Sequence, residues 1–302
     1  MGKYIIAGGT GFIGGYLTAL LRKEGHEVYV LTTQKSRLSF SEKGQQFVYW
    51  QPKERYIDET FTLSECKLIN LAGAGVAEQR WTAARKKEIL DSRIDCLETL
   101  YLAVEKKQLQ VQHLVSSSAI GYYGEGYKLF AEDDLGDDSF LSSVCRKWEE
   151  AAWQFARHNT PVAVIRTGIV LGKEGGALKE FLKPLRFGVA GIPSDGQQIY
   201  SWIHVEDISR IFYYLSSKNK EGIFNGVAPH PASVNTIFTA MIRHTHPFFM
   251  RVHAPDISLK LLLGEMAIEV LKSTNVSSEK ILQDGFRFLY EEIDPCIDAL
   301  MT

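Results

Sequence analysis

Short apolar segments alternate with amphipathic segments from the start of the chain to about Leu171. The near-continuous apolar runs predict strands, and the helical spacing of apolar residues between them predicts helices. Strands separated by helices indicate βαβ units, and strands this apolar are typical of a parallel sheet covered on both faces. The predicted strands are residues 3–8, 27–32, 46–50, 67–73, 113–119 and 161–171, and the predicted helices are residues 12–25, 85–107 and 141–158.

The pattern becomes irregular from about residue 172, with many glycine, proline and polar positions. At 302 residues the chain is long for one small domain, which favours a large α/β domain with an elaboration, or two domains. We expect a first domain at residues 1–172, to which later segments can return. Residues 173–302 are then a smaller substrate-side region over the carboxyl edge of the sheet.

Composition excludes several classes of protein. The net charge of −2 supplies no basic field, so we expect no nucleic-acid or anionic-membrane partner. No apolar run reaches the ~20 residues of a membrane span, and the chain enters a strand without room for a signal peptide. The four cysteines are scattered, which predicts a reducing, cytoplasmic location, and the pair His244 and His246 lacks further ligands, so no metal site is predicted.

The segment GGTGFIG lies between the first predicted strand and the first predicted helix. In that context Gly8 permits a tight turn, Gly11 lets backbone approach a pyrophosphate, and Gly14 lets the helix pack closely on the strand. The start of the helix also offers free N–H groups to phosphate oxygens. The segment therefore predicts a dinucleotide site, and the alternative is a turn without a ligand.

The end of the second predicted strand indicates which dinucleotide is bound. A site for NAD usually places an acidic residue there for the ribose 2′-hydroxyl, whereas this chain reads LTTQKSR. Thr33, Lys35 and Arg37 suit a 2′-phosphate instead. We therefore predict NADP as the cofactor, with NAD as the alternative if the two cations are ordinary loop charges.

The glycine spacing, the LAG after the fourth strand and the SSSA after the fifth resemble the short-chain dehydrogenase/reductase superfamily, in its extended, epimerase-like branch. Longer stretches resemble an atypical subgroup of sugar-nucleotide epimerases that ends in a small C-terminal domain of unknown function. These stretches are residues 70–93, 116–124, 165–178, 201–208 and 261–300. The resemblance implies a Rossmann-like doubly wound parallel sheet that binds NADP or NAD, a C-terminal domain at about residues 250–302, and the homodimer common in the superfamily.

The resemblance also places cofactor contacts by position. It implies that Thr10, Phe12 and Ile13 join the glycines around the pyrophosphate, and that Leu71, Ala72 and Gly73 line the adenine-ribose side. It implies that Ser116 and Ser117 lie beneath the nicotinamide, with Thr167, Gly168 and Ile169 on its other side.

The usual catalyst of the superfamily is a serine with a Tyr-x-x-x-Lys pair on the next helix, and only part of it is present. Ser118 occupies the serine position, but the residue four before Lys147 is Ser143. The nearest phenols are Tyr122 and Tyr123. We predict that Ser118 with one of these tyrosines forms the proton relay, because an unaided hydroxyl is a poor acid or base. We expect a nearby arginine, Arg93, to lower the pKa of the inward tyrosine.

Six further residues are candidates for substrate binding. Arg80 and Trp81 could clamp a phosphate and stack a base or sugar, or could be a surface arginine over a packed indole. His204 could act as an acid or base, or could orient a loop. The full set is Arg80, Trp81, Arg93, Gln198, Trp202 and His204.

Two functions remain open on this sequence. One is an NADP(H)-dependent oxidoreductase or epimerase acting on a small polar substrate such as a nucleotide sugar. The other is an NADPH-binding sensor with little or no turnover, which the missing Tyr-x-x-x-Lys pair would favour.

Overall fold

The computed structural model describes residues 1–40, 42–244 and 249–302, so His246 lies outside the described residues. Its centre is an eight-stranded sheet in which every pairing is parallel except the last, between β3 and β4. The strands, in spatial order, are β13 (Gly222–Gly226), β8 (Val162–Thr167), β6 (Leu109–Ala119), β5 (Leu63–Asn70), β1 (Lys3–Ala7), β2 (Glu27–Thr32), β3 (Gln45–Gln51) and β4 (Tyr56–Ile57).

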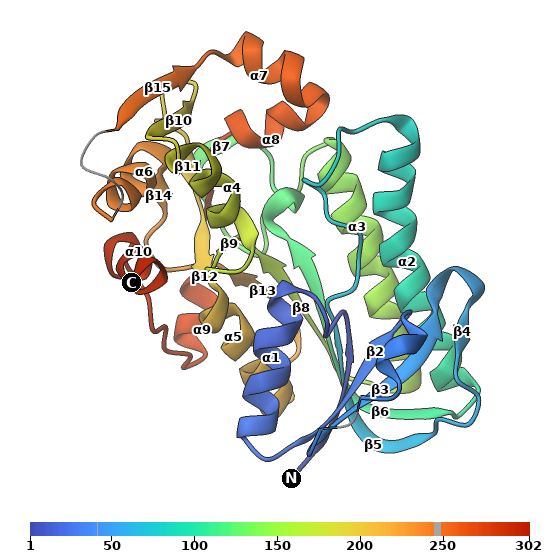
Figure 1. Cartoon of the computed structure of the whole chain (residues 1–302). Helices are drawn as coiled ribbons and strands as arrows, with labels where there is room; N and C mark the ends of the chain where they lie inside the picture. The colour runs from blue at the N-terminus through green and yellow to red at the C-terminus, as the bar shows by residue number, and fades with distance from the viewer. Residues whose placement is uncertain (41, 245–248) are drawn as a thin grey trace.

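Helices cover both faces of this sheet (Figure 1). On one face lie α1 (Phe12–Lys23) and α5 (Val205–Ser217), which bury Leu17, Leu21 and Phe212 against it. On the other face lie α2 (Ala83–Glu105) and α3 (Phe140–Trp153), which bury Leu97, Trp148 and other apolar side chains in a second core. The predicted Rossmann-like, doubly wound α/β fold is confirmed.

The strand order reverses at β1. From β1 the chain proceeds to β2 and β3 on one side and later to β5, β6, β8 and β13 on the other. In doubly wound sheets a ligand binds at this reversal, outside the carboxyl ends of the strands. The loops that follow β1, β2, β5, β6 and β8 therefore meet at one place, which we call the carboxyl edge.

The strand predicted at residues 161–171 is two strands instead of one. It breaks at Gly168, and β9 (Ile169–Leu171) leaves the main sheet to pair with β12 (Trp202–His204). The reason is local: the Gly168 N–H bonds Gly226 O at 3.0 Å, and a Cβ at position 168 would collide with Ser201 O. The chain thus turns where only glycine fits.

The C-terminal region has its own core around Trp202, Phe238 and Ile297. Three small sheets contribute to this region: β9 with β12; β10 (Val189–Pro193) with β15 (Met250–Ala254); and β14 (Ala232–Ser233), β11 (Ile199–Tyr200), β16 (Thr274–Val276) and β7 (Gly126–Phe130), in that order. Its helices are α4 (Gly176–Leu185), α6 (Val234–Ile242), α7 (Asp256–Leu263), α8 (Ala267–Leu271), α9 (Glu279–Gln283) and α10 (Ile293–Met301).

The chain crosses between the two regions more than once. α5 and β13 return to the main sheet after β12, so the predicted division at residue 172 stays a prediction with these two as returning elements. The buried Asp207 of α5 accepts hydrogen bonds from the N–H groups of Leu289 and Tyr290, both at 2.9 Å. The segment at residues 289–290 is therefore attached to α5, which packs on the main sheet.

Two further observations concern the described part of the chain. None of its helices combines the length and hydropathy that crossing a membrane requires. His244 bonds the Asp298 carboxylate at 2.6 Å, which attaches the end of α6 to α10.

Candidate functional site at the carboxyl edge

The glycine loop after β1 turns tightly against the loop after β5. Gly8 has a φ of +83°, and a Cβ there would lie 2.8 Å from the Leu71 carbonyl carbon and 2.9 Å from the Ala72 nitrogen. The turn is closed by a 3.0 Å hydrogen bond from the Gly11 N–H to Gly8 O. Gly8 thus brings Leu71 and Ala72 against the loop, at the reversal of strand order.

Gly14 and Gly11 lie in different surroundings. A Cβ at Gly14 would lie within 3.0 Å of Gly8 and Gly9 backbone atoms, because α1 packs directly on the loop there. A Cβ at Gly11 would have one neighbour within 4 Å, Gly8 O at 3.3 Å, and Gly11 is exposed. Gly14 therefore serves packing, whereas the space beside Gly11 is open to a ligand.

The N-terminus of α1 is suited to an anion. Gly11 is its N-cap residue, no side chain caps the helix, and no acidic residue lies in its first turn. The free N–H groups and the helix dipole therefore remain available to phosphate oxygens. Thr10 is exposed at the same turn, and Ile13 is half-buried against the core.

Phe12 makes a contact that was not predicted. Its ring packs against the glycine-rich segment after β9, where a Cβ at Gly172, Gly175 or Gly176 would lie within 3.0 Å of a Phe12 atom. Phe12 thus connects the glycine loop to the C-terminal region, and its predicted place beside a pyrophosphate stays a prediction.

The segment after β2 carries the cations predicted to bind a 2′-phosphate. Lys35 and Arg37 lie in a 3₁₀ turn, Lys35–Arg37, directly after the exposed Thr33. Lys35 Nζ is 5.0 Å from the Tyr49 ring centroid, and Arg37 Nε donates to Gln34 Oε1 at 2.8 Å. Neither cation is paired with a carboxylate in the described ion pairs, which leaves their charges available to an anionic ligand.

Arg93 of α2 packs against the loop after β5 and holds it in place. Arg93 is buried, its Nη1 donates to Ala74 O at 3.1 Å and Ile89 O at 2.8 Å, and its guanidinium lies 4.8 Å from the Trp148 ring centroid. A Cβ at Gly73 would lie 3.1 Å from Arg93 Cγ. The structure thus places Arg93 behind Gly73, and its predicted substrate contact stays a prediction.

The serine run lies at the carboxyl end of β6 and is buried. Ser116 Oγ accepts from Asn70 Nδ2 at 3.4 Å, and Ser117 Oγ donates to Ser118 O at 3.3 Å. Next to them, at the end of β8, the buried Thr167 Oγ1 has no hydrogen-bond partner among the residues that the structure describes. A buried hydroxyl without a partner costs free energy unless a ligand or water supplies one, so Thr167 fits a cofactor contact. Gly168 and Ile169, predicted beside it, are half-buried.

Ser118 belongs to a buried polar network. Its Oγ donates to Glu149 Oε1 of α3 at 2.7 Å, and Glu149 forms a bidentate ion pair with Arg166 of β8 at 2.9 and 3.0 Å. The side chains of all three residues are buried. The Ser118 hydroxyl therefore donates its hydrogen to Glu149. Toward a ligand it can only accept a hydrogen bond.

The same Arg166 organises both candidate tyrosines. Its Nη1 donates to Tyr123 Oη at 3.0 Å, and its guanidinium lies 3.4 Å from the Tyr122 ring centroid. Tyr123 is fully buried and its hydroxyl donates to Asn225 Oδ1 at 2.8 Å, whereas Tyr122 is partly exposed. Of the two phenols, Tyr122 is thus the one that solvent or a ligand can reach.

One expectation about this network is wrong. We expected the inward tyrosine to have a lowered pKa with Arg93 as the cause. Instead burial raises the pKa of Tyr123 to about 12, although the neighbouring Arg166 acts in the opposite direction. Desolvation of the phenolate outweighs the nearby cation, so Tyr123 stays protonated at neutral pH.

Glu149, Arg166 and Asn225 are the network residues that sequence reasoning missed. The sequence did contain a signal, because Arg166 is a lone charge in the apolar run PVAVIRTGIVL and a buried charge requires a partner. The partner could not be read from the sequence, because Glu149 lies on a separate helix beside a second glutamate, Glu150.

Arg80 and Trp81 lie on the loop before α2. Arg80 is exposed, whereas Trp81 donates from Nε1 to Val76 O at 2.8 Å and packs edge-on against Phe140 at 5.1 Å. The arrangement leaves Arg80 free for an anion and uses Trp81 to shape the loop.

The remaining substrate candidates are buried in the C-terminal region. Trp202 is fully buried and donates to His230 O at 3.0 Å, so its indole packs in the third core. Gln198 donates to Pro193 O at 3.1 Å, while its buried Oε1 has no partner in the described part of the chain. These contacts assign Trp202 to packing and leave one Gln198 oxygen available.

His204 has a structural place at the start of α5. Its Nδ1 accepts from the Glu206 N–H at 3.1 Å, which caps the helix, and its ring packs against the Tyr290 ring with the centroids 4.1 Å apart and the planes inclined at 40°. Burial lowers the pKa of His204 to about 4, so the ring is neutral at pH 7. This geometry matches the loop-orienting alternative.

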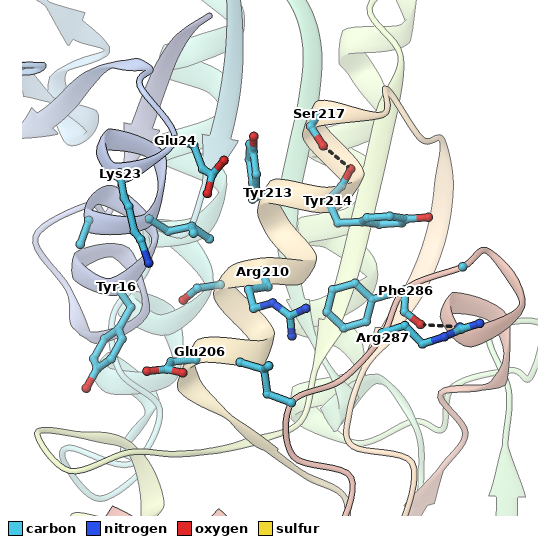
Figure 2. Close-up of a pocket in the computed structure, with 15 residues that line it drawn as sticks. Tyr16, Lys23, Glu24, Glu206, Arg210, Tyr213, Tyr214, Ser217, Phe286 and Arg287 are labelled. Carbon is cyan, nitrogen blue, oxygen red and sulfur yellow. Dashed lines mark hydrogen bonds between the residues drawn. The ribbon is translucent and has the colours of Figure 1, made fainter. Parts of the chain in front are cut away.

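A separate groove of about 750 Å³ lies between α1 and α5 and is closed at one side by the segment from Gly285 to Leu289. Figure 2 shows Tyr16 and Lys23 on the α1 wall and Arg210, directed toward Phe286, on the α5 wall. No residue predicted for the site lines this groove. It is thus distinct from the carboxyl edge.

The comparison with known families agrees with this geometry. The chain matches the model of the NAD dependent epimerase/dehydratase family over residues 4–227, which is most of its length. The chain belongs to this family. Residues 254–300 also match a domain of unknown function, DUF1731, so the resemblance to an extended epimerase subgroup with this tail is confirmed.

Individual relatives within the epimerase/dehydratase family cover the whole chain. An epimerase family protein of Arabidopsis thaliana, the chloroplastic SDR39U1 homolog, is 33% identical over 98% of this chain and 86% of its own length. The crystal structure of human epimerase family protein SDR39U1 with NADPH covers 99% of both chains at 28% identity and a TM-score of 0.85. The nucleoside-diphosphate sugar epimerase of Corynebacterium glutamicum covers 99% of this chain but 58% of its own, at 27% identity and a TM-score of 0.74.

Proposed function

We propose that this epimerase-family protein binds NADP(H) across the carboxyl edge and exchanges hydride with a nucleotide sugar. One observation carries the proposal: the uncapped N-terminus of α1 begins at an exposed glycine, and the open side of Gly11 has room for a pyrophosphate. The buried, unpartnered Thr167 Oγ1 at the nicotinamide side adds a second polar group that requires a partner.

The choice of NADP over NAD rests on the segment after β2. Thr33, Lys35 and Arg37 offer a hydroxyl and two cations, and that segment has no carboxylate to accept from a ribose 2′-hydroxyl. A 2′-phosphate gains charge-assisted hydrogen bonds from such groups. The human relative whose structure contains NADPH supports the same cofactor.

The chemistry requires a proton to move as hydride moves. When bound, the nicotinamide supplies the hydride donor or acceptor. On the protein side, Ser118 can accept a hydrogen bond from a substrate hydroxyl, because its own hydrogen is committed to Glu149. Tyr122 is the phenol that can exchange the proton, since Tyr123 is buried and bonded to Asn225.

The substrate class is inferred from the exposed cation of Arg80 and from the family. Arg80 lies on the loop after β5, where it can reach a diphosphate, and Gln198 Oε1 can accept from a sugar hydroxyl. The name of the Corynebacterium relative supports a nucleoside-diphosphate sugar. We further propose a cytoplasmic location and a homodimer, for which the outer faces of α2 and α3, with a groove of about 450 Å³ between them, offer a surface.

The test has two stages. Fluorescence titration of the purified protein should show tighter binding of NADPH than of NADH. Transfer of deuteride from labelled NADPH should then be followed over a panel of nucleoside-diphosphate sugars and carbonyl compounds. Exchange with one of them supports the enzyme, whereas equal affinity for the two cofactors would contradict the NADP assignment.

A second candidate function is cofactor binding without turnover. The observation that favours it is the burial of Ser118 and Tyr123 in a network where their hydroxyls already have protein partners. Tight NADPH binding without exchange on any substrate of the panel would support this sensor.

A further inference from the structure

One segment of the C-terminal region joins the two sides of the molecule. The strap, as we call residues 255–271, consists of α7, a 3₁₀ turn (Gly264–Met266) and α8. Both of its ends are firmly held. On one side the Ala254 carbonyl accepts from the Ser194 N–H at 2.9 Å, and on the other the Val270 carbonyl accepts from Tyr200 Oη at 2.7 Å.

The first helix of the strap, α7, is weakly packed. No residue of α7 is buried, and the side chains of Ile257, Leu261 and Leu262 are 74%, 74% and 69% exposed. A helix with so few buried apolar contacts belongs to the parts of a protein that open at low free-energy cost. α7 is thus held in place mainly by the contacts of the turn that follows it, at Gly264 and Glu265.

This turn meets the loop of Arg80 and the first turns of α2. The Glu265 carboxylate forms an ion pair with Lys86 Nζ, and a Cβ at Gly264 would lie 3.2 Å from Arg80 Nη2. Figure 1 shows the strap at the top of the molecule, reaching from β15 toward the upper ends of α2 and α3. Residues far apart in the sequence therefore meet beside a predicted substrate contact.

The opposite side of this contact is rigid. Arg85 is buried and ion-paired with Glu78 and Glu88, and its Nη2 also donates to Gly75 O. Arg93 and Trp81 bind two further carbonyls of the same loop. The loop before α2 is thus fixed by buried side chains, whereas the strap that touches it is not.

We propose that the strap is a lid over the ligand at the carboxyl edge, held closed by the Lys86–Glu265 ion pair. Gly264, whose φ of +63° is a left-handed conformation suited to glycine, lets the strap turn sharply where it meets Arg80. Opening separates Glu265 from Lys86 and uncovers Arg80, and closing brings them together over the ligand. This inference rests on the proposed cofactor site, because the Arg80 loop follows β5 and thus belongs to the carboxyl edge, where NADPH is proposed to bind.

Charge reversal across the ion pair tests the lid. The variants are Glu265→Lys, Lys86→Glu and the double swap, with Lys87→Glu as the matched control, because Lys87 pairs with Asp91 on its own helix. Glu265→Lys is the more informative single variant, since Lys86 also lies 5.2 Å from the Phe140 ring centroid. Amide hydrogen exchange of the strap needs no ligand, and NADPH release is measured by stopped-flow displacement.

The expected result is a joint effect on both measurements. Each single reversal should speed strap exchange and NADPH release by about two- to fivefold, the range for an exposed ion pair, and the double swap should restore both. The control should change neither. High salt should speed strap exchange without ligand in the wild type and slow it in the single variants, because salt screens both the attraction of the native pair and the repulsion between the like charges.

The outcomes separate the lid from the cofactor proposal. Unchanged strap exchange in the single variants would overturn the ion pair as the clasp. Faster strap exchange with unchanged NADPH release would overturn the strap as a gate. Failure of the wild type to bind NADPH would instead contradict the proposed function, and the hydrogen-exchange result would then still report on the strap.

Discussion

The two halves of the carboxyl edge differ in how their polar groups are satisfied. At the glycine loop the helix start is uncapped and Gly11 is exposed. At the serine run, Ser118 and Tyr123 are bonded to protein groups within a buried network. The glycine loop thus presents free N–H groups to a ligand, whereas in the serine run the hydroxyls of Ser118 and Tyr123 already have protein partners and only the neighbouring Thr167 Oγ1 lacks one among the described residues.

This difference separates binding from chemistry. Unpartnered donors indicate where a ligand supplies the missing acceptor, because buried polar groups are nearly always satisfied. A complete network instead indicates rigidity, and here it orients Ser118 and supports Tyr122 through Arg166. The dinucleotide site is therefore the stronger part of the functional proposal, and the proton relay depends on one partly exposed phenol.

The largest expected effect comes from disrupting the buried network around Arg166. Glu149→Ala leaves Arg166 as an unpaired buried cation, which should lower the free energy of unfolding by about 3–5 kcal/mol. Urea denaturation followed by circular dichroism measures it. The exposed neighbour gives the control, Glu150→Ala, which should change stability by less than about 0.5 kcal/mol. A loss below about 1 kcal/mol for Glu149→Ala would show that the network is not a structural centre.

The next largest effect comes from filling the open space beside Gly11 in the glycine loop. Gly11→Val places a side chain where a pyrophosphate would lie, and NADPH affinity should fall by at least about a hundredfold while the fold is kept. Gly14→Val is the contrasting variant, because its side chain would meet Gly8 and Gly9 and should destabilise the domain itself. Titration and thermal unfolding on both variants separate the two roles. Retained NADPH binding by Gly11→Val would mean that the glycines form only a turn.

A smaller effect concerns which dinucleotide is preferred. Thr33→Asp should repel a 2′-phosphate and accept from a 2′-hydroxyl, so the order of NADPH and NADH affinities should reverse, each changing by about tenfold. Thr60→Asp, on an exposed position after β4, controls for the added charge. Competition titrations with both cofactors give the ratio, and an unchanged ratio would argue against this segment as the 2′ site.

The smallest effect distinguishes the two tyrosines. Tyr123→Phe removes a buried hydrogen bond to Asn225 and should cost about 1–2 kcal/mol of stability, whereas Tyr122→Phe should cost less than about 0.5 kcal/mol. The effect on activity should be the opposite. On a proven substrate, hydride exchange should be lost in Tyr122→Phe and kept in Tyr123→Phe. If Tyr123→Phe alone abolishes exchange, the buried phenol takes part in the chemistry after all.

Most of the fold could be predicted from the sequence because its signals are local. The apolar runs and helical spacings are set within single elements, and the predicted strand at 27–32 coincides with β2. The break at Gly168 could not be predicted, because it depends on Ser201 and Gly226, which belong to later parts of the chain. The return of α5 and β13 to the sheet depends on tertiary pairing in the same way.

The candidate site could likewise be predicted only where its signals are local. A glycine loop carries its own signature, since backbone geometry dictates the residue type at each position. The Glu149–Arg166 pair does not, because either residue alone resembles an ordinary charge. The pKa of Tyr123 also could not be foreseen, since it depends on how completely the surrounding chain removes water.

The position of β16 has a consequence for how the chain folds during synthesis. β16 pairs with β7 and β11 at once, and Ser277 N donates to Phe130 O at 2.8 Å. Residues near Phe130 therefore lack this partner until residues 274–277, more than a hundred positions later in the sequence, have been synthesised. Such long-range closures are slow, and they leave an unpaired strand edge meanwhile. On the ribosome, the segment that follows Tyr122 and Tyr123 is therefore expected to reach its final pairing only after residues 274–277 have emerged.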